Sequence, residues 1–376
     1  MEVKTMKTYN LSFKYRIYPN ETQANTINQT FGCTRLVYNR FLAQRKELYE
    51  AEKKSVTYNT QAKELPLLKL ELPFLKEVDS IALQQSLKNL ETAYKNFFQK
   101  RTAFPKFKSK RSTRKSYNTV STSNNIRIEG NFLKLPKLGL VKTKLHRQIP
   151  QNYVIKSATI SQEPNGAYYV SLLTEFEKDI KEVPSDNNIV GLDFAMSELF
   201  VSSDNQRAHY PRFFRKLEAK LIKAGRELSR KVKFSQNWHK AKLKVAKIHN
   251  LIKNSRKDFL HKLSNELVTK YNAIILEDLN MKGMSAALNF GKSVADNGWG
   301  MFTTMLQYKS MFLGKQVIKI DKWFPSSKTC SFCGAIKAEL PVSSRVYKCD
   351  ECNSEIDRDL NASINIREVG KELLAY

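Results

Sequence analysis

The sequence has no long hydrophobic run, and no apolar stretch approaches the roughly 20 residues that a helix needs to span a bilayer. Its opening residues, MEVKTMKTYN, lack the apolar segment and the small-residue cleavage site of a signal peptide. Cysteine is scarce as well, with five in 376 residues, which excludes a disulfide-rich secreted scaffold. We therefore expect no membrane partner and a cytoplasmic protein in a reducing setting.

Acidic residues are few relative to basic ones. Lys and Arg total 64 against 36 Asp and Glu, which gives a formal net charge of +28. So large an excess repels itself unless a polyanion neutralises it, and nucleic acid is the expected partner. The length is sufficient for two or three domains with a sizeable core.

Four of the five cysteines form two C-x-x-C pairs near the C-terminal end. Cys330 and Cys333 make the first pair, and Cys349 and Cys352 make the second. This spacing is typical of a zinc ribbon, in which four thiolates hold one Zn²⁺ tetrahedrally. Two disulfides or four structural thiols are the alternative, but short C-x-x-C loops suit a metal better than a bridge.

Three acids stand at places where an unpaired carboxylate is costly. Asp193 in GLDFAMSELFVS and Glu277 in AIILEDLN follow apolar runs that suit buried strands, and Asp359 follows the second cysteine pair. Taken alone, Asp359 is more simply read as the N-cap of a following helix. Together, three such acids indicate a site for two Mg²⁺ ions, which prefer hard oxygen ligands.

The chain resembles TnpB, the family of RNA-guided nucleases encoded by small insertion sequences, which is similar in turn to type V CRISPR effectors with a RuvC-like nuclease. The resemblance covers nearly the full length. It is carried, in order, by KYRIYPNETQ, GCTRLVYNRFL, ALQQSLKNLETAYKNFF, GLDFAMSELFV, FLHKLSNELV, IILEDLNMKGM, SVADNGWG, FPSSKTCSFCG and DRDLNASINI.

The resemblance implies that Asp193, Glu277 and Asp359 are the catalytic carboxylates that bind Mg²⁺. Asp357 is then a neighbour, and a pairing with Arg358 or another base stays open for it. A guide RNA is implied as a bound component, with double-stranded target DNA and its displaced strand as partners. Many members have glycine where this chain has Ala195, and a methyl is tolerated there if φ is below zero.

Candidate nucleic-acid contacts fall in three places. Gln84 and Lys88 lie on the outward face of a helix that begins after Asp79 or Ser80, and the resemblance makes Gln84 and Tyr58 part of a reader of a short motif in duplex DNA. A solvated helix face is the simpler alternative. The other candidates are basic residues of the segment 104–115 and of a helical pair in 211–270: Lys106, Lys108, Lys110, Arg111, Arg226, Arg230, Lys240 and Lys244.

The expected fold is α/β, with an RNase H-like (RuvC) nuclease domain that carries an inserted zinc ribbon, and a β-barrel wedge domain that carries a helical recognition insert. A strand over 7–18 is expected to join the barrel, and residues 280–300 suggest a mobile lid. The expected boundaries are 1–18 and 117–185 for the wedge, 19–116 for the insert, 186–325 and 354–376 for the nuclease, and 326–353 for the ribbon.

The predicted function is Mg²⁺-dependent, RNA-guided cleavage of DNA in association with a prokaryotic transposable element. A transposase that uses the same acids for strand transfer is one alternative. A cleavage-free RNA-guided repressor is another, although such a protein is expected to lack at least one of the three acids. A monomer is favoured, while the sequence leaves the oligomeric state open.

Overall fold

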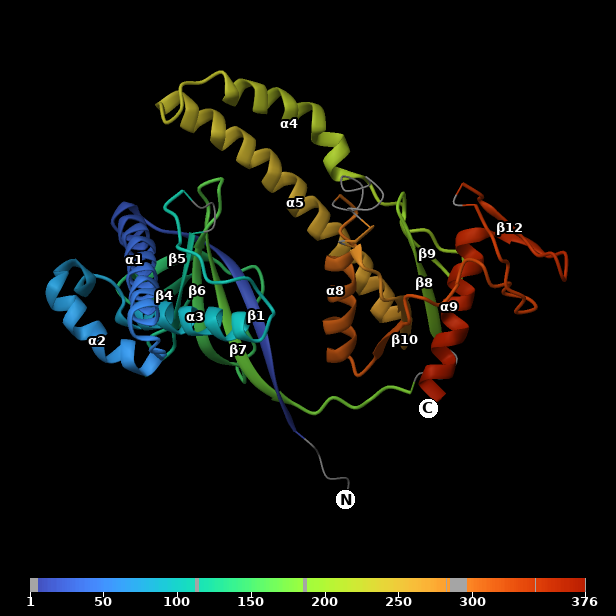
Figure 1. The fold of residues 1–376 in the computed structure, drawn as a ribbon, viewed down its shortest axis with the longest axis horizontal. Coiled ribbons are helices and arrows are strands. Elements are labelled where there is room, and N and C mark those ends of the chain that lie inside the picture. The colour runs from blue at the N-terminus through green and yellow to red at the C-terminus, as the bar shows by residue number, and fades with distance from the viewer. Residues whose placement is uncertain are drawn as a thin grey trace. The chain divides into compact units, whose positions relative to one another are not determined.

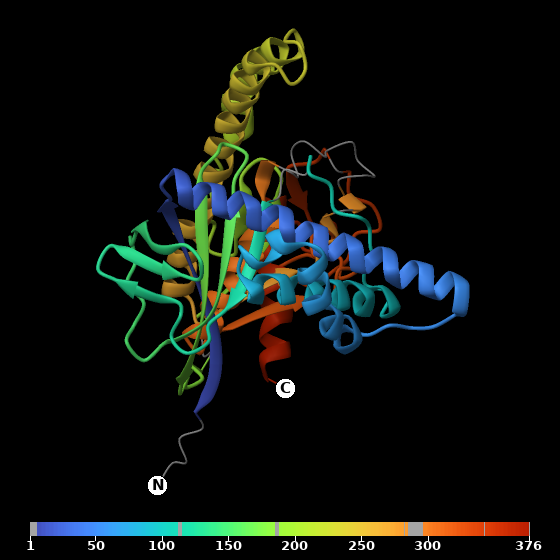
Figure 2. The same cartoon turned by 90° about the vertical axis from the view of Figure 1, so that its left-hand side faces the viewer.

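The computed structural model describes residues 6–111, 115–184, 188–281, 283–284, 296–341 and 343–375. The chain divides into two compact units, Met1–Lys178 and Asp179–Tyr376. Most of their elements are labelled in Figure 1, and Figure 2 shows the same ribbon from a second side. Among the described helices, none combines the length and the apolar character that crossing a membrane requires.

The first unit is built on a seven-stranded antiparallel sheet with the order β2-β6-β7-β1-β5-β4-β3. β1 pairs with both β7 and β5, so the strand predicted at 7–18 does join this sheet. Among the described strands, β2 and β3 end the hydrogen-bonded order, and closure into a barrel stays a prediction. The strands are β1 (Lys7–Tyr18), β2 (Lys115–Val120), β3 (Arg127–Glu129), β4 (Phe132–Leu135), β5 (Gly139–Lys144), β6 (Val154–Gln162) and β7 (Tyr168–Lys178).

Three helices lie between β1 and β2 in the chain: α1 (Glu21–Glu52), α2 (Tyr58–Glu71) and α3 (Ser80–Phe98). Asn20 and Gln23 form a capping box that starts α1, and the Asp79 carboxylate caps α3. The helices share a core that includes Val37, Leu42, Leu65, Leu83 and Leu87. α2 was not predicted from the sequence, because Pro66 in its interior is a residue that normally ends a helix.

The second unit contains a four-stranded sheet with the order β11-β10-β8-β9. β8 (Ile189–Ala195), β10 (Ala273–Glu277) and β11 (Gln316–Ile320) run parallel, and β9 (Leu199–Ser202) pairs with β8 as an antiparallel hairpin. Its helices are α4 (Phe213–Ser229), α5 (Gln236–Lys270), α8 (Trp299–Phe312) and α9 (Arg358–Ala375). The predicted helical pair in 211–270 is therefore present as α4 and α5.

Alternate residues of the central strands pack on opposite faces of this sheet, as the period of a strand requires. One set joins side chains of α5 and α8 in a core that includes Val190, Leu192, Ile274, Leu276, Leu260 and Phe302. The other set joins Ile366 of α9 in a core with Ile189, Ala273, Ile275 and Ile320. Both faces are therefore covered by helices, which explains the near-continuous apolar runs in the two strands.

The cysteine-rich segment carries a small antiparallel ribbon. β12 (Val346–Lys348) pairs with β13 (Glu355–Asp357), and α9 follows directly. Tyr347 of β12 is fully buried and packs with Cys330 and Cys349. The mixed α/β class predicted for this half of the chain is confirmed, while the finer domain boundaries stay predictions.

Candidate active site, metal centre and nucleic-acid interface

Asp193 and Glu277 occupy equivalent positions on neighbouring strands. β8 and β10 run parallel with Leu192 opposite Leu276, so the acid that follows each leucine lies at the same carboxyl edge of the sheet. Both leucines pack on the face that α5 and α8 cover. Because side chains alternate along a strand, both acids belong to the opposite face, which α9 covers. Strand register therefore brings these two carboxylates together.

Glycine lets α9 lie close to these strands. A Cβ on Gly191 of β8 would stand 2.1 Å from the carbonyl oxygen of Ser363, and one on Gly370 would stand 2.4 Å from Ile275 side-chain atoms. No real Cβ tolerates either distance, so both contacts require glycine. This close packing holds Asp359, in the first turn of α9, near the edge that carries Asp193.

The charges of Glu277 and Asp359 act on Asp193. Burial raises the pKa of Asp193 well above its usual range, and the negative charges of Glu277 and Asp359 raise it further. Burial also raises the pKa of Glu277 and of Asp359. Positive charges of Arg345, Arg358 and Arg207 partly offset the rise in the pKa of Asp359, and the Arg345 guanidinium lies 4.0 Å from its carboxylate.

Asp357 has the role that the sequence offered to Asp359. The Asp357 Oδ1 accepts hydrogen bonds from the backbone N–H of Asp359, at 3.1 Å, and of Leu360, at 3.0 Å, which caps α9. Its Oδ2 lies 3.0 Å from the guanidinium of Arg207. The N-cap interpretation of Asp359 is therefore wrong, and the open pairing of Asp357 is with Arg207.

The four cysteines lie together in the ribbon, and their sulfur atoms are all within 4.8 Å of one another. Sγ of Cys330 lies 3.7 Å from that of Cys352, and Sγ of Cys333 lies 3.6 Å from that of Cys349. Four thiolates around zinc with bonds of about 2.3 Å place the sulfurs about 3.8 Å apart. The donor set fits zinc, and these distances exclude the disulfide alternative.

A serine hydroxyl supports this thiolate cluster. The Ser354 hydroxyl lies 3.2 Å from Sγ of Cys352 and lowers the pKa of that thiol. Burial raises the pKa of Cys330, but hydrogen bonds from Ser354 and from backbone N–H groups outweigh it and lower the pKa to about 6. A backbone hydrogen bond from Ala335 lowers the pKa of Cys333, but the neighbouring sulfurs of Cys352, Cys349 and Cys330 accept its hydrogen, which outweighs this and raises the pKa. The thiolate form, which binds metal, is therefore favoured at Cys330 and Cys352.

The carboxylates are spread more widely than the thiolates. Among the residues that the structure describes, the four cysteines are the only group of three or more His, Cys, Asp or Glu side chains with all ligand atoms within 4.8 Å. The carboxylates of Asp193, Glu277 and Asp359 therefore form a less tight group than the four thiolates. Oxygen ligands select Mg²⁺, whereas the thiolates select zinc.

Residues that were not predicted from the sequence connect the two clusters. Asn361 of α9 donates to the carbonyl of Thr329 at 2.7 Å and accepts from the N–H of Ser331 at 2.9 Å. Asn365 donates to the carbonyls of Ser326 and Thr329. The Ser326 hydroxyl in turn donates to the Glu277 carboxylate. A buried asparagine every fourth residue of an otherwise apolar helix face is the signal that could have revealed this link.

A buried cluster adjoins the strand that carries Asp193. The Asp296 carboxylate is 3.0 Å from Arg256 of α5 and accepts from the N–H of Phe214 at 3.1 Å. Asn297 is buried and donates to the carbonyl of Ala195 at 3.4 Å. Ala195 has negative φ, so a methyl there is unstrained, as expected. Residues 285–295 of the predicted lid lie outside the described part of the chain.

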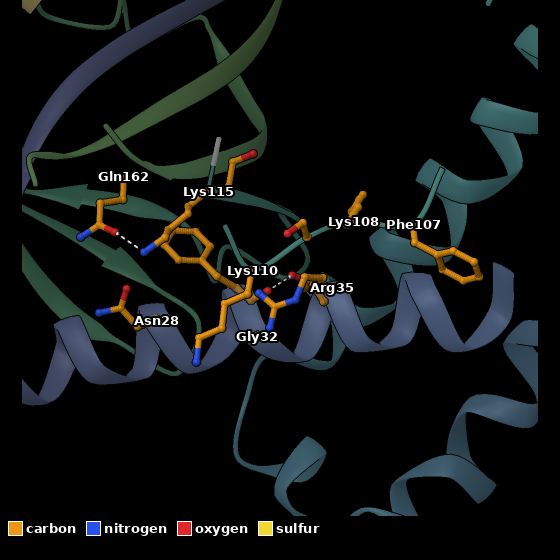
Figure 3. A pocket seen from close by; sticks show the side chains of 12 residues that line it. Asn28, Gly32, Arg35, Phe107, Lys108, Lys110, Lys115 and Gln162 are labelled. Atoms are coloured by element: carbon orange, nitrogen blue, oxygen red, sulfur yellow. Dashed lines mark hydrogen bonds between the residues drawn. The ribbon is translucent and has the colours of Figure 1, made fainter. Parts of the chain in front are cut away.

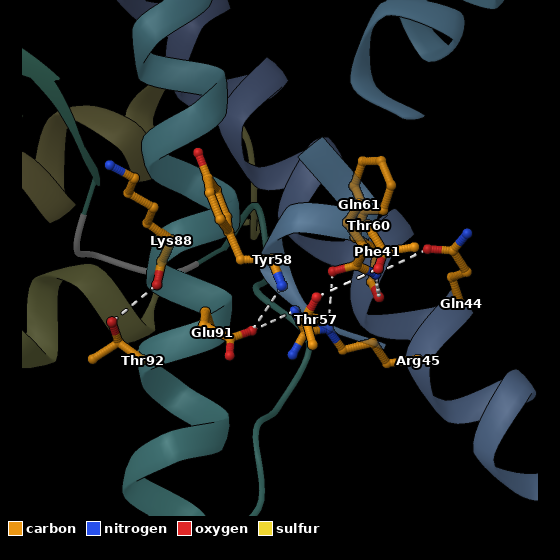
Figure 4. A network of polar contacts seen from close by, with 10 residues as sticks. All are labelled: Phe41, Gln44, Arg45, Thr57, Tyr58, Thr60, Gln61, Lys88, Glu91 and Thr92. Atoms are coloured by element: carbon orange, nitrogen blue, oxygen red, sulfur yellow. Dashed lines mark hydrogen bonds and ion pairs between the residues drawn. The ribbon is translucent and has the colours of Figure 1, made fainter. Parts of the chain in front are cut away.

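In the first unit, a buried polar network holds the start of α2 (Figure 4). Arg45 is 7% exposed, lies 2.7 Å from the Glu91 carboxylate and donates to the Gln61 side chain at 2.9 Å. The same Glu91 oxygen accepts the backbone N–H of Tyr58 at 3.1 Å. The ammonium of Lys88 lies 5.7 Å from the Tyr58 ring centroid. Tyr58 and Lys88, predicted as nucleic-acid contacts, are thus neighbours on a rigid support.

The other predicted nucleic-acid residues lie at the surface. Gln84 is exposed one turn before Lys88 on α3, and Arg226, Arg230 and Lys240 are exposed along α4 and α5. Lys244 is not free, because its ammonium lies 3.0 Å from the Glu227 carboxylate. In the segment before β2, exposed positions are Lys106, Lys108, Lys110 and Arg111.

Taken together, three acids at one edge of a mixed α/β sheet and a four-cysteine ribbon tied to the same helix form the candidate site of this chain. Three family descriptions match the chain. Residues 171–288 match "Probable transposase", residues 299–366 match "Cas12f1-like, TNB domain" and residues 6–54 match "Helix-turn-helix domain". In this structure the last range contains β1 and the single long helix α1.

Full-length relatives identify the family. A protein of Streptomyces pristinaespiralis named "Putative RNA-guided DNA endonuclease" is 36% identical over 97% of this chain and 90% of its own length. InsQ of Escherichia coli strain K12, with the same description, is 35% identical over 97% of this chain and 93% of its own. A mimivirus protein named "TnpB-like protein L79" is 27% identical over 68% of this chain and 51% of its own. The chain belongs to the TnpB family.

Two solved structures share the fold. The protein of a Cas12f1-sgRNA-target DNA complex aligns with a TM-score of 0.61 over 96% of this chain and 99% of its own, at 14% identity. The mini-RNA-guided endonuclease CRISPR-Cas_phi3 aligns with a TM-score of 0.53 over 96% of this chain and 92% of its own, at 10% identity. At such low identity the likeness concerns the fold alone.

Proposed function

We propose that this protein is an RNA-guided DNA endonuclease associated with a transposable element. The single observation that carries the proposal is the convergence of Asp193, Glu277 and Asp359 on one edge of the sheet. Two full-length relatives carry the same description in their names. The net charge of +28 supplies the attraction for RNA and DNA that this activity needs.

The residues of the site have distinct tasks in this proposal. Asp193, at the centre of the three charges, and Asp359 would hold Mg²⁺ ions. When bound, these ions would supply activation of water for attack on the scissile phosphate and stabilisation of the leaving oxygen, a chemistry that gives 5′-phosphate and 3′-hydroxyl ends. Glu277 completes the set, with its carboxylate oriented by the Ser326 hydroxyl. Asp357 keeps the start of α9 in place and does not take part directly.

The four thiolates hold one zinc ion in this proposal, and the ion fixes the ribbon beside the active site. Because Asn361 and Asn365 tie the first cysteine loop to α9, the metal stabilises the helix that carries Asp359. The partners are a guide RNA, the target duplex and its displaced strand. Tyr58, Gln84 and Lys88 contact a short motif in that duplex, and the exposed cations of α4 and α5 contact backbone phosphates.

The test is a cleavage assay with the protein purified together with RNA expressed from its own locus. Plasmid carrying the matching target is incubated with Mg²⁺, or with EDTA as the metal-free control. We expect cutting by the wild type with Mg²⁺ only, and binding without cutting by Asp193→Ala. Equal nicking by both proteins would contradict the assignment of the site.

The same assay separates the other candidates. A transposase would join strands through a 3′-hydroxyl, so products larger than the input DNA would favour it. A cleavage-free repressor would bind the target and leave it intact. All three acids are present in this chain, which favours the nuclease over the repressor.

A further inference from the structure

A pocket in the first unit was not predicted, and it lies beside α1. It has a volume of about 930 Å³ and is formed by α1, the segment before β2, the edge strand β2 and its neighbour β6 (Figure 3). We call it the α1 pocket. Its lining is Asn28, Phe31, Gly32, Thr34, Arg35, Phe107, Lys108, Ser109, Lys110, Lys115, Ser116 and Gln162.

One face of α1 forms the floor of this pocket. Asn28, Gly32, Arg35 and Asn39 follow one another at spacings of four, three and four, which places them on one helical stripe. The Asn39 amide fastens the crossing segment to this stripe, because it donates to the carbonyl of Lys108 at 2.9 Å and accepts its N–H at 2.8 Å. The pocket is therefore held by a specific backbone clamp.

The charge of the lining is positive on every side. Arg35, Lys108, Lys110 and Lys115 come from three elements, and the lining contains no Asp or Glu. In the described part of the chain, none of these four cations forms an ion pair with a carboxylate. The ammonium of Lys108 stacks on Tyr38 at 3.9 Å, and that of Lys115 donates to Gln162 at 3.3 Å. Four cations without an anion indicate an anionic ligand.

Gly32 is the unusual residue of the floor. Glycine in the interior of a helix costs about 1 kcal/mol relative to alanine. Most close-packed glycines offset this cost by admitting a neighbour, but a Cβ on Gly32 would meet nothing within 4 Å. The free space lies in the pocket, where Figure 3 shows Lys110 lying over the stretch of α1 that carries Gly32. The missing side chain therefore leaves space over Gly32 for a bound ligand.

We propose that the α1 pocket holds the sugar-phosphate backbone of a nucleic-acid strand, with Gly32 as the point where that strand comes closest to α1. Arg35 and Lys110 bind phosphate oxygens there, while Asn28, Ser109 and Ser116 offer hydrogen bonds to the sugar and phosphate. The exposed ring of Phe107 stands at the rim for a base to stack on. The inference rests on the proposed function, since the strand is either the guide RNA or the target DNA.

Gly32→Gln tests the proposal, and Gly32→Ala is its matched control. Both residues favour the helix, so both variants should unfold at or above the wild-type temperature. Only glutamine reaches far enough into the pocket to displace a strand. Lys110→Gln gives an independent variant that removes an exposed charge and leaves α1 unchanged.

Binding is measured in an Asp193→Ala background by gel shift, so that cutting does not intervene. One arm uses protein free of RNA with the guide RNA, and the other uses the assembled protein–RNA complex with a target duplex. We expect Gly32→Gln to weaken one arm about tenfold or more, equally for targets of different sequence, with Gly32→Ala near wild type. For Lys110→Gln, the slope of log Kd against the logarithm of the salt concentration should fall by about one, because one phosphate contact is lost.

The arm that weakens identifies the strand as RNA or as DNA. Wild-type affinity of Gly32→Gln in both arms, with an unchanged unfolding temperature, would overturn the proposal. A loss that varied with target sequence would also overturn it, because a backbone site reads no bases. Binding is measured without cleavage. A wild-type protein that failed to cut DNA would contradict the proposed function but would not change the binding result for the pocket, so the two failures are distinguishable.

Discussion

The two clusters of metal ligands in the second unit differ in how they are brought together. All four cysteines lie between residues 330 and 352, and two short loops deliver their sulfurs to one point. The three acids come from β8, β10 and α9, which are distant in sequence. Their approach depends on parallel strand register and on a glycine contact between β8 and α9. A compact, local cluster can close around a structural ion, whereas a wider, assembled one leaves room for substrate.

The largest effect should come from removing one acid of the assembled cluster. We expect Glu277→Gln to lower the cleavage rate by a factor on the order of a thousand or more, because the variant keeps the shape and loses the charge that binds Mg²⁺. Asp278→Asn is the matched control. Asp278 is exposed and pairs with Lys319 at 2.7 Å, so its loss should change cleavage little. Equal losses in both variants would disprove the role given to Glu277.

Removing one thiolate of the four-cysteine cluster should have the next largest effect on cleavage. Cys349→Ser is expected to remove zinc, found by metal analysis at about one per chain in the wild type. Structural zinc contributes to the folding free energy of the ribbon. Because Asn361 and Asn365 of α9 are hydrogen-bonded to this ribbon, loss of zinc should also disturb the position of Asp359. Cleavage should therefore fall about tenfold or more at unchanged guide-RNA binding. Cys33→Ala, in the first unit, should keep full zinc content. Unchanged zinc in Cys349→Ser would refute the metal centre.

Gly191→Ala tests the contact that assembles the acids. The new methyl would meet the Ser363 carbonyl at 2.1 Å, and overpacking of this kind costs about 1–3 kcal/mol. We expect a lower free energy of unfolding in urea. We also expect roughly tenfold slower cleavage, because a shift of α9 away from β8 also displaces Asp359. Gly225→Ala in α4, where a Cβ meets nothing within 4 Å, should be neutral or stabilising. A stable and fully active Gly191→Ala protein would contradict the close packing.

The smallest effect should come from replacing Asp357, the first acid of the Asp357-Arg358-Asp359 (DRD) motif, and it should distinguish this acid from Asp359. Asp357→Ala removes the cap of α9 and should cost about 1 kcal/mol of unfolding free energy, with cleavage within a few-fold of wild type. Asp357→Asn keeps a capping oxygen and loses mainly the pair with Arg207, so it should be milder still. Asp359→Asn should abolish cleavage. If Asp357→Ala were as inactive as Asp359→Asn, the assignment of roles within DRD would be reversed.

Much of the fold followed from local patterns. The strand 7–18, the α3 cap at Asp79, the helical pair α4 and α5, and the buried strands before Asp193 and Glu277 were all expected, because period, caps and apolar runs are local signals. α2 was missed because of Pro66, and Asp359, considered alone, offered itself as the cap of α9, a role that Asp357 has in the structure. A cap depends on where the helix begins, and the ribbon strand β13 sets that point at Arg358.

The sequence by itself predicted the four-cysteine cluster and the basic character, because spacing and charge can be read from the order of residues, and its resemblance to the TnpB family singled out the three acids. Only the tertiary structure decided that Asp193 and Glu277 share a face and that Gly191 admits α9. It also showed that Ser326, Asn361 and Asn365 join the two clusters, and that Gly32 leaves the floor of a cationic pocket open. These features depend on packing between segments far apart in the chain, which no local pattern records.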